Sequence, residues 1–174
     1  TRTELFRSLS AKEFKEVFPK MRKRNLAEGE KLYRQGAEGQ SMFVCLEGLL
    51  TSSVAVNGEK DVKVEAYRAG QHFGECNILN DTGRVSTVIA NTDVLVYEID
   101  KDDLAPILKK HATFQAQLEQ AAKDQIEKIK EQKKVARKKR ESTPKPGKKS
   151  SVKSAIQTFF TGIFDQTGEE ENKK

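Results

Sequence analysis

Hydrophobic and polar positions divide the chain into three parts, and the first part has a helical pattern. Ser10 is followed three residues later by Glu13, the spacing of a capping box, in which both side chains accept hydrogen bonds from backbone N–H groups at a helix start. Apolar residues recur at near-helical spacing within residues 4–23: Leu5, Leu9, Phe14, Val17 and Phe18. We therefore expect a helix across residues 4–23, ahead of the strands.

The second part, residues 26–99, has the sequence pattern of a small all-β unit. Short strand-like runs with turn residues about every ten positions predict a small antiparallel β-roll. The clearest hairpin joins residues 51–56 to residues 61–67 through Asn57 and Gly58, with a loop longer than two residues. The runs are rich in Val, Phe, Leu, Thr and Tyr, and they are broken by glycines: Gly29, Gly36, Gly39, Gly48, Gly58 and Gly70.

The third part returns to a helical pattern. Asp102 and Asp103 can start a helix that carries Leu104, Ile107 and Leu108, and a long helix is expected over residues 113–140. This long helix has one apolar stripe, which can cover a pocket, pair with another helix or pack on the roll: Phe114, Leu118, Ala121, Ala122, Ile126 and Ile129. The predicted fold class is α+β, a jelly-roll-like β-roll flanked by an N-terminal helix and C-terminal helices.

Basic residues are concentrated towards the C-terminal end of the chain. Residues 123–149 hold twelve basic and four acidic side chains, although the whole chain has a net charge of +6. Residues 142–151 are typical of a flexible linker, and a second apolar helical face follows it within residues 152–165: Val152, Ile156, Phe159, Phe160, Ile163 and Phe164. This tail can lie on an anionic membrane surface, dock on protein or remain solvated.

We expect five segments: a ligand-binding domain at 1–120, a basic helical extension at 121–141, a linker at 142–151, an amphipathic helix at 152–165 and a polar tail at 166–174. Neither a signal peptide nor an apolar run of about 20 residues, the length of a spanning helix, is evident. The chain begins at Thr1 without Met, which indicates a piece of a longer protein. Cys45 and Cys76 lack metal-ligand spacing, and we interpret them as reduced core thiols.

Residues 73–88, which we call the cassette, carry the candidate chemistry. Glu75 and Arg84 stand nine residues apart around a turn between apolar segments. An arginine fork binds phosphate oxygens, a carboxylate accepts hydrogen bonds from ribose hydroxyls, and free N–H groups of a helix start favour an anion. The pattern predicts a pocket for a small sugar phosphate. The alternatives are a surface ion pair between Glu75 and Arg84, and a Gly74 that serves only a tight turn.

The cassette resembles that of the cyclic nucleotide-binding domain family, whose pattern is Phe-Gly-Glu, a few apolar residues, and then Arg with small residues and a strand. The resemblance extends from Leu5 to Phe114. The matching positions are Phe73, Gly74, Glu75, Leu79, Arg84, Ser86 and Val88 in the cassette, Gly36, Gly39, Phe43, Gly48, Gly58 and Gly70 before it, and Leu95, Ile99 and Leu104 after it.

The resemblance implies that Arg84 neutralises a cyclic phosphate and Glu75 holds the ribose 2′-hydroxyl, beneath a lid formed by the long helix. Val85 occupies the position that often carries Thr or Ser in guanosine-binding members, so cAMP is expected rather than cGMP. Ser86 either donates a hydroxyl or is simply a small strand residue. The expected ligand-binding residues are Phe73, Gly74, Glu75, Cys76, Asn77, Ile78, Arg84, Val85 and Ser86, with backbone N–H groups supplied by Cys76, Asn77 and Ile78.

Other function classes have little support. A metal-dependent enzyme on a β-roll needs several His and carboxylate ligands, but the chain has only His72 and His111, without ligand-spaced partners. No Ser-His-Asp set, P-loop or pair of general acids emerges. We expect no enzyme activity, metal or cofactor. Because no helix-turn-helix follows the long helix, we expect no specific nucleic-acid binding, although the basic tail can bind phosphates nonspecifically.

The sequence therefore predicts a cAMP sensor that acts through movement of its lid helix. We expect it to regulate an ion channel as the C-terminal sensor on the cytoplasmic face of a membrane, for example in a channel of the bacterial mechanosensitive-like class. The full-length protein would then be a homo-oligomer with an upstream membrane or effector domain. The alternatives are a regulatory subunit of a kinase and a scaffold domain that has lost the ligand.

Overall fold

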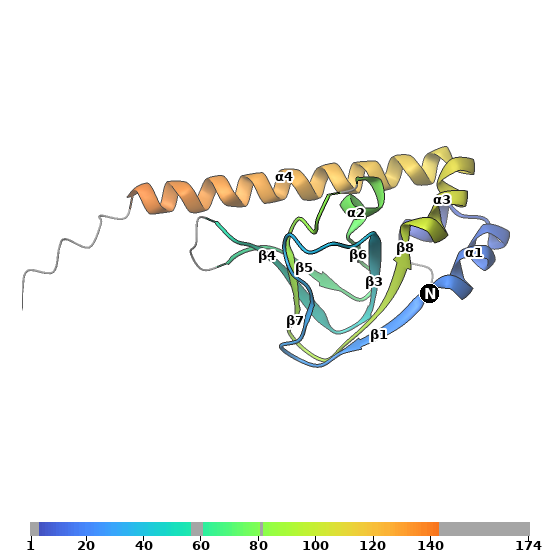
Figure 1. The fold of residues 1–174 in the computed structure, drawn as a ribbon, viewed down its shortest axis with the longest axis horizontal. Helices are drawn as coiled ribbons and strands as arrows, with labels where there is room; N and C mark the ends of the chain where they lie inside the picture. The colour runs from blue at the N-terminus through green and yellow to red at the C-terminus, as the bar shows by residue number, and fades with distance from the viewer. Residues whose placement is uncertain (1–3, 57–60, 81, 143–174) are drawn as a thin grey trace, which may run out of the picture. The chain divides into compact units, whose positions relative to one another are not determined.

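The computed structural model describes residues 4–56, 61–80 and 82–142. Strands form a roll, and helices lie beside it (Figure 1). The helical elements and strands are, in chain order, η1 (Glu4–Ser8), α1 (Ala11–Val17), η2 (Phe18–Lys20), β1 (Arg22–Leu26), β2 (Lys31–Tyr33), β3 (Ser41–Glu47), β4 (Leu49–Val54), β5 (Val62–Arg68), β6 (His72–Phe73), α2 (Glu75–Leu79), β7 (Thr87–Ala90), β8 (Val94–Asp100), α3 (Lys101–Lys110) and α4 (Ala112–Ser142).

The described strands form two antiparallel sheets of four strands each. One sheet has the order β1-β8-β3-β6 and the other the order β2-β7-β4-β5. The predicted hairpin is present as β4 and β5, which pair antiparallel with Leu50 opposite Tyr67 and Val54 opposite Val62. Its turn at residues 57–60 lies outside the described residues. The predicted α+β fold with a small antiparallel roll is confirmed.

Strand β3 separates two hydrophobic clusters because successive side chains of a strand point to opposite faces. Met42 and Val44 pack towards the helices, together with Leu9, Ile99 and Phe114. On the other face, side chains fill the interior of the roll: Phe43, Cys45, Leu50, Tyr67, Phe73, Val88 and Val96. A strand that is buried on both sides holds the roll and its helices together.

The prediction of a single helix over residues 4–23 is wrong, although the predicted capping box at Ser10 is confirmed. Ser10 is the N-cap of α1 and forms the predicted capping box with Glu13. Because an N-cap residue has extended backbone, here with φ −62° and ψ 163°, Ser10 separates η1 from α1. Pro19 lies in the short turn η2, after which Met21 is extended and β1 begins at Arg22.

The C-terminal helices largely follow the prediction. Asp102 and Asp103 lie in the first turn of α3, and α4 is one continuous helix. In Figure 1 α4 passes over α2 and the end of the roll, and Ile129 packs with Val54 and Val56. The compact unit that contains the roll extends to Arg137. None of the helices within the described ranges is both long and apolar enough to cross a membrane.

Several sequence-based predictions fall beyond the described part of the chain. The linker after Ser142, the amphipathic helix at 152–165 and the polar tail at 166–174 lie outside the described residues. The division of the chain into five segments stays a prediction.

Candidate functional site

The cassette begins with a sharp turn that requires glycine. Gly74 connects β6 to α2 with φ +93°, a left-handed conformation that side chains other than glycine rarely adopt. A Cβ atom at this position would also lie 3.2 Å from both the Cα of Met42 and the carbonyl oxygen of Ser41. The conformation and the close approach to β3 both favour glycine here, so α2 starts tightly against that strand.

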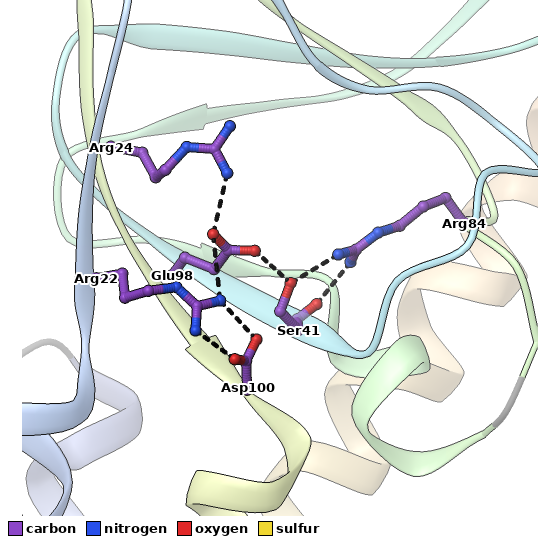
Figure 2. Close-up of polar contacts among 6 residues, drawn as sticks. All are labelled: Arg22, Arg24, Ser41, Arg84, Glu98 and Asp100. Carbon is purple, nitrogen blue, oxygen red and sulfur yellow. Dashed lines mark hydrogen bonds and ion pairs between the residues drawn. The ribbon is translucent and has the colours of Figure 1, made fainter.

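Arg84 is buried, with 5% of its surface exposed, and its guanidinium points at Ser41 (Figure 2). Nη1 donates to the Ser41 carbonyl oxygen at 2.6 Å and to Asn77 Oδ1 at 3.2 Å, while Nη2 donates to Ser41 Oγ at 2.8 Å. Nε has no hydrogen-bond partner among the described residues. An unpaired buried donor is costly, so this N–H group is suited to an acceptor that enters from outside the chain.

Two aromatic rings lie beside the guanidinium. The central carbon of the Arg84 guanidinium is 4.4 Å from the ring centroid of Tyr33 and 5.2 Å from that of Phe43. Such contacts favour a cation over the ring face. Burial lowers the pKa of Arg84, but arginine remains charged near neutral pH. Burial raises the pKa of Tyr33, so its phenol is neutral and adds no negative charge.

The loop of residues 36–39 packs closely against Arg84. The main chain of Arg84 exchanges hydrogen bonds with this loop, since its N–H donates to Ala37 O and its carbonyl accepts from Gly36 N, both at 2.8 Å. A Cβ atom on Gly39 would lie only 2.8 Å from Nη2 and 2.9 Å from Nε. Gly39 therefore keeps clear the guanidinium edge that includes the unpaired Nε. The residues present fit a small anion at this edge.

Glu75 is buried in the first turn of α2, with 2% of its surface exposed. Its Oε1 contacts Nδ1 of His72. Among the described residues its side-chain partner is thus His72 and not Arg84. The surface ion pair between Glu75 and Arg84, considered above as an alternative, is excluded because both side chains are buried and each has other partners.

The N–H groups at the start of α2 differ in their availability. Glu75 and Cys76 occupy its first two positions, where an N–H group has no acceptor within the helix. The Asn77 N–H instead donates to Gly74 O at 3.1 Å. This N–H group is therefore already hydrogen-bonded within a turn and is not available to an anion. Asn77 instead contributes its side-chain oxygen, which accepts from Arg84.

The other predicted site residues have packing contacts in the structure. Phe73 stacks on Tyr67, with ring centroids 4.4 Å apart, and lies in the roll core. Ile78 belongs to the cluster under the helices. Val85 is half-buried and packs with Val54, Val56 and Ile129. Ser86 is fully buried just before β7.

Helix α4 is joined to the cassette through a buried polar side chain. Nε2 of Gln125 donates to the Tyr67 hydroxyl at 3.2 Å, and Cys76 Sγ donates to Gln125 Oε1 at 3.3 Å. Burial raises the pKa of Cys76 to about 11, so the thiol carries its proton. On the outer side of the helix, Lys128 forms an ion pair with Glu65 of β5.

Sequence reasoning missed three residues of this site: Tyr33, Ser41 and Gln125. Gln125 lies three residues after Ala122 and four before Ile129, so helical periodicity could have placed it on the buried stripe. Ser41 and Tyr33 gave no comparable signal, because their contacts with Arg84 join positions 43 and 51 residues apart in the sequence.

Comparisons with known proteins support the assignment to a family. The cAMP-dependent protein kinase regulatory subunit of Blastocladiella emersonii is 31% identical over 122 residues, covering 70% of this chain and 30% of that protein. The regulatory subunit of Mucor circinelloides f. lusitanicus is 28% identical over 109 residues, covering 63% of this chain and 24% of that protein. The chain thus spans about a quarter to a third of the length of these curated relatives.

A solved structure shows the same fold, and a family profile covers half of the sequence. The regulatory domain of Toxoplasma gondii PKA, crystallised with cAMP, has a TM-score of 0.64 at 23% identity, covering 70% of this chain and 46% of that one. The profile described as Cyclic nucleotide-binding domain matches residues 23–111. The chain belongs to the cyclic nucleotide-binding domain family.

Proposed function

We propose that this chain is a regulatory module that binds a cyclic nucleotide, with cAMP as its preferred ligand. The observation that carries the proposal is the buried guanidinium of Arg84: its Nε has no partner among the described residues, and it lies where a side chain at position 39 would collide with it. A cyclic phosphate at this edge would receive a charge-assisted hydrogen bond and neutralise a buried positive charge.

Glu75 supplies the second contact in this proposal. Its carboxylate, buried at the start of α2, can accept hydrogen bonds from the ribose 2′-hydroxyl. The N–H groups of Glu75 and Cys76, which lack acceptors within α2, add donors near the same anion. The two charged side chains would hold the phosphate and the sugar of one ligand.

The preference for adenine rests on Val85 and its neighbours. Val85 packs among Val54, Val56 and Ile129, and its side chain offers no hydroxyl to a guanine amino group. Similarity to other proteins supports cAMP as well. The kinase regulatory subunits described above are named cAMP-dependent, and the Toxoplasma gondii domain was crystallised with cAMP.

Helix α4 is the element that would transmit binding. Gln125 joins it to Cys76 of the cassette and to Tyr67 of the roll. A ligand can shift the helix only if it binds one arrangement of α4 better than another. A nucleotide that orders the cassette around Arg84 would act on α4 through Cys76.

The partner that best fits the relatives is a protein kinase. Two curated relatives are kinase regulatory subunits, which favours this alternative over the ion channel expected from the sequence. The expected channel, the membrane surface and the homo-oligomer receive no support from these relatives. The kinase assignment is tested by co-elution of the chain with a cAMP-dependent protein kinase catalytic subunit, and absence of a complex both with and without cAMP would contradict it.

The ligand is tested by calorimetric titration of residues 1–174 with cAMP, cGMP and inorganic phosphate. We expect the tightest binding with cAMP, weaker binding with cGMP and the weakest with phosphate, which lacks the ribose. Equal affinity for the three would contradict a nucleotide site. Heat only with cGMP would contradict the role of Val85.

A further inference from the structure

A continuous line of polar contacts runs from Arg84 to the exposed strand β1 (Figure 2). Ser41 Oγ accepts from Arg84 Nη2 and donates to Glu98 Oε1, both at 2.8 Å. The other oxygen of Glu98 accepts from Arg24 Nη1 at 3.0 Å and lies 3.6 Å from Nη2 of Arg22. Four strand positions thus connect the buried guanidinium with the surface.

The chemistry of these groups fixes the direction of each hydrogen bond. An ionised carboxylate only accepts, so the Ser41 hydroxyl must direct its proton to Glu98 and keep its lone pairs for Arg84. Ser41 also presents its carbonyl oxygen to Arg84 Nη1 at 2.6 Å. One residue therefore binds both terminal nitrogens of the guanidinium, and Nε is the nitrogen that has no partner among the described residues.

Glu98 is held in place from the β1 side. Arg22 lies directly opposite Glu98 in the β1–β8 ladder and also forms a two-contact ion pair with Asp100. The guanidinium groups of Arg22 and Arg24 hold the Glu98 side chain at the position where it accepts from Ser41. The side chain of Glu98 has only 12% exposure, so solvent weakens these contacts less than it would those of a fully exposed pair.

We propose that Ser41 and Glu98 are positioning residues for Arg84: Ser41 binds its terminal nitrogens and Glu98 orients the Ser41 hydroxyl, so that Nε stays directed to the cyclic phosphate. The inference rests on the proposed function, since it assigns these residues to the same site. Ser41 contributes rigidity rather than a ligand contact. A guanidinium that is already fixed loses less conformational entropy when the phosphate binds.

The binding test compares four variants in titrations with cAMP: Ser41→Ala, Arg84→Lys, the double variant of both, and Ser53→Ala. Ser53 is a matched control because it is a buried strand serine that lies outside this line of contacts. We expect Ser41→Ala to weaken binding about tenfold, as for a lost hydrogen bond to a charged group. The double variant should bind like Arg84→Lys, since Ser41 acts through Arg84. Ser53→Ala should bind like the parent.

A second measurement on the unliganded protein separates positioning from a merely structural role. The Nε–H resonance of Arg84 in ¹⁵N spectra should broaden or shift in Ser41→Ala and in Glu98→Gln, and stay in place in Ser53→Ala. An unchanged resonance in Ser41→Ala would overturn the inference whether or not cAMP binds. An unchanged cAMP affinity in Ser41→Ala beside a weakened Arg84→Lys would also overturn it. Parent-like affinity in Arg84→Lys would instead overturn the phosphate site of the proposed function.

Discussion

Gln125 and Tyr67 form a hydrogen bond of 3.2 Å between helix α4 and strand β5, in a region closed to solvent. Gln125 also accepts from the thiol of Cys76 in the cassette. It is the one buried polar side chain of α4 among those described. A buried amide is stabilising only while its partners are in place, so this residue makes the position of α4 depend on the cassette.

Replacing Gln125 by Leu should loosen α4. The apolar side chain keeps most of the volume but leaves Tyr67 and Cys76 without the amide, and we expect a loss of about 1–3 kcal/mol in unfolding free energy. Amide hydrogen exchange should accelerate around residues 122–129. The control is Gln120→Ala, on an exposed position of the same helix. Exchange in Gln125→Leu equal to that in the control would contradict the role of this contact.

Phe114→Ala should lower the unfolding free energy strongly, because the start of α4 packs in the hydrophobic core. Phe114 is fully buried and stacks on Phe6, with ring centroids 6.0 Å apart. Truncating such a ring costs about 3–5 kcal/mol. Val135→Ala, at a position with 50% exposure further along α4, should change the unfolding free energy by less than about 0.5 kcal/mol. Urea denaturation measures both, and similar losses would contradict the assigned packing.

Gly39→Ala should damage the binding site. The added Cβ would lie 2.8 Å from Arg84 Nη2, so the guanidinium or the loop must move, at a cost of about 1–3 kcal/mol. We expect weaker cAMP binding together with lower stability.

The control for this variant is Gly29→Ala. Gly29 also has a positive φ, of +82°, but a Cβ there would have no atom within 4 Å. This variant should lose about 1 kcal/mol of stability from backbone strain and keep its affinity. Equal cAMP affinities of the two variants would show that Gly39 does not protect the guanidinium edge.

Stability should fall at alkaline pH because buried thiols and phenols resist ionisation. Burial raises the pKa of Cys45 and Cys76 from an ordinary 9.0 to about 11, and it raises the pKa of Tyr33 and Tyr67 as well. Between pH 9 and 11 the folded chain therefore holds protons that the unfolded chain releases. The unfolding free energy must decrease as pH rises through this range.

Urea denaturation across this pH range tests the assignment to the thiols. The double variant Cys45→Ala/Cys76→Ala should show a shallower decline in unfolding free energy than the parent. A decline of the same slope in both proteins would contradict a contribution from the two cysteines.

Local patterns were sufficient to predict several elements of this fold. The capping box of Ser10, the hairpin of β4 and β5 and the stripe on α4 each depend on neighbours within a few residues, and the structure has all three. The prediction of a single helix over residues 4–23 was wrong because apolar spacing alone does not reveal the extended backbone at an N-cap such as Ser10.

The surroundings of Arg84 could not be read from local patterns. Ser41 precedes the apolar run of β3, and Glu98 stands within β8, where an isolated charge is typical of an exposed strand position. Their contact with each other and with Arg84 depends on the pairing of β3 with β8 and on the loop of residues 36–39. These pairings join distant segments, and hydrophobic alternation does not specify which strands meet.

If Arg84, held by Ser41, offers its Nε to a cyclic phosphate, the most direct test is a calorimetric titration of the chain and of Arg84→Ala with cAMP. We predict micromolar or tighter binding by the parent and a loss of about 2–5 kcal/mol in the variant, as for truncating one partner of a buried charge pair. Far-ultraviolet circular dichroism must show that the variant is folded. Equal affinity of the folded variant and the parent, or no binding by the parent, would contradict the account.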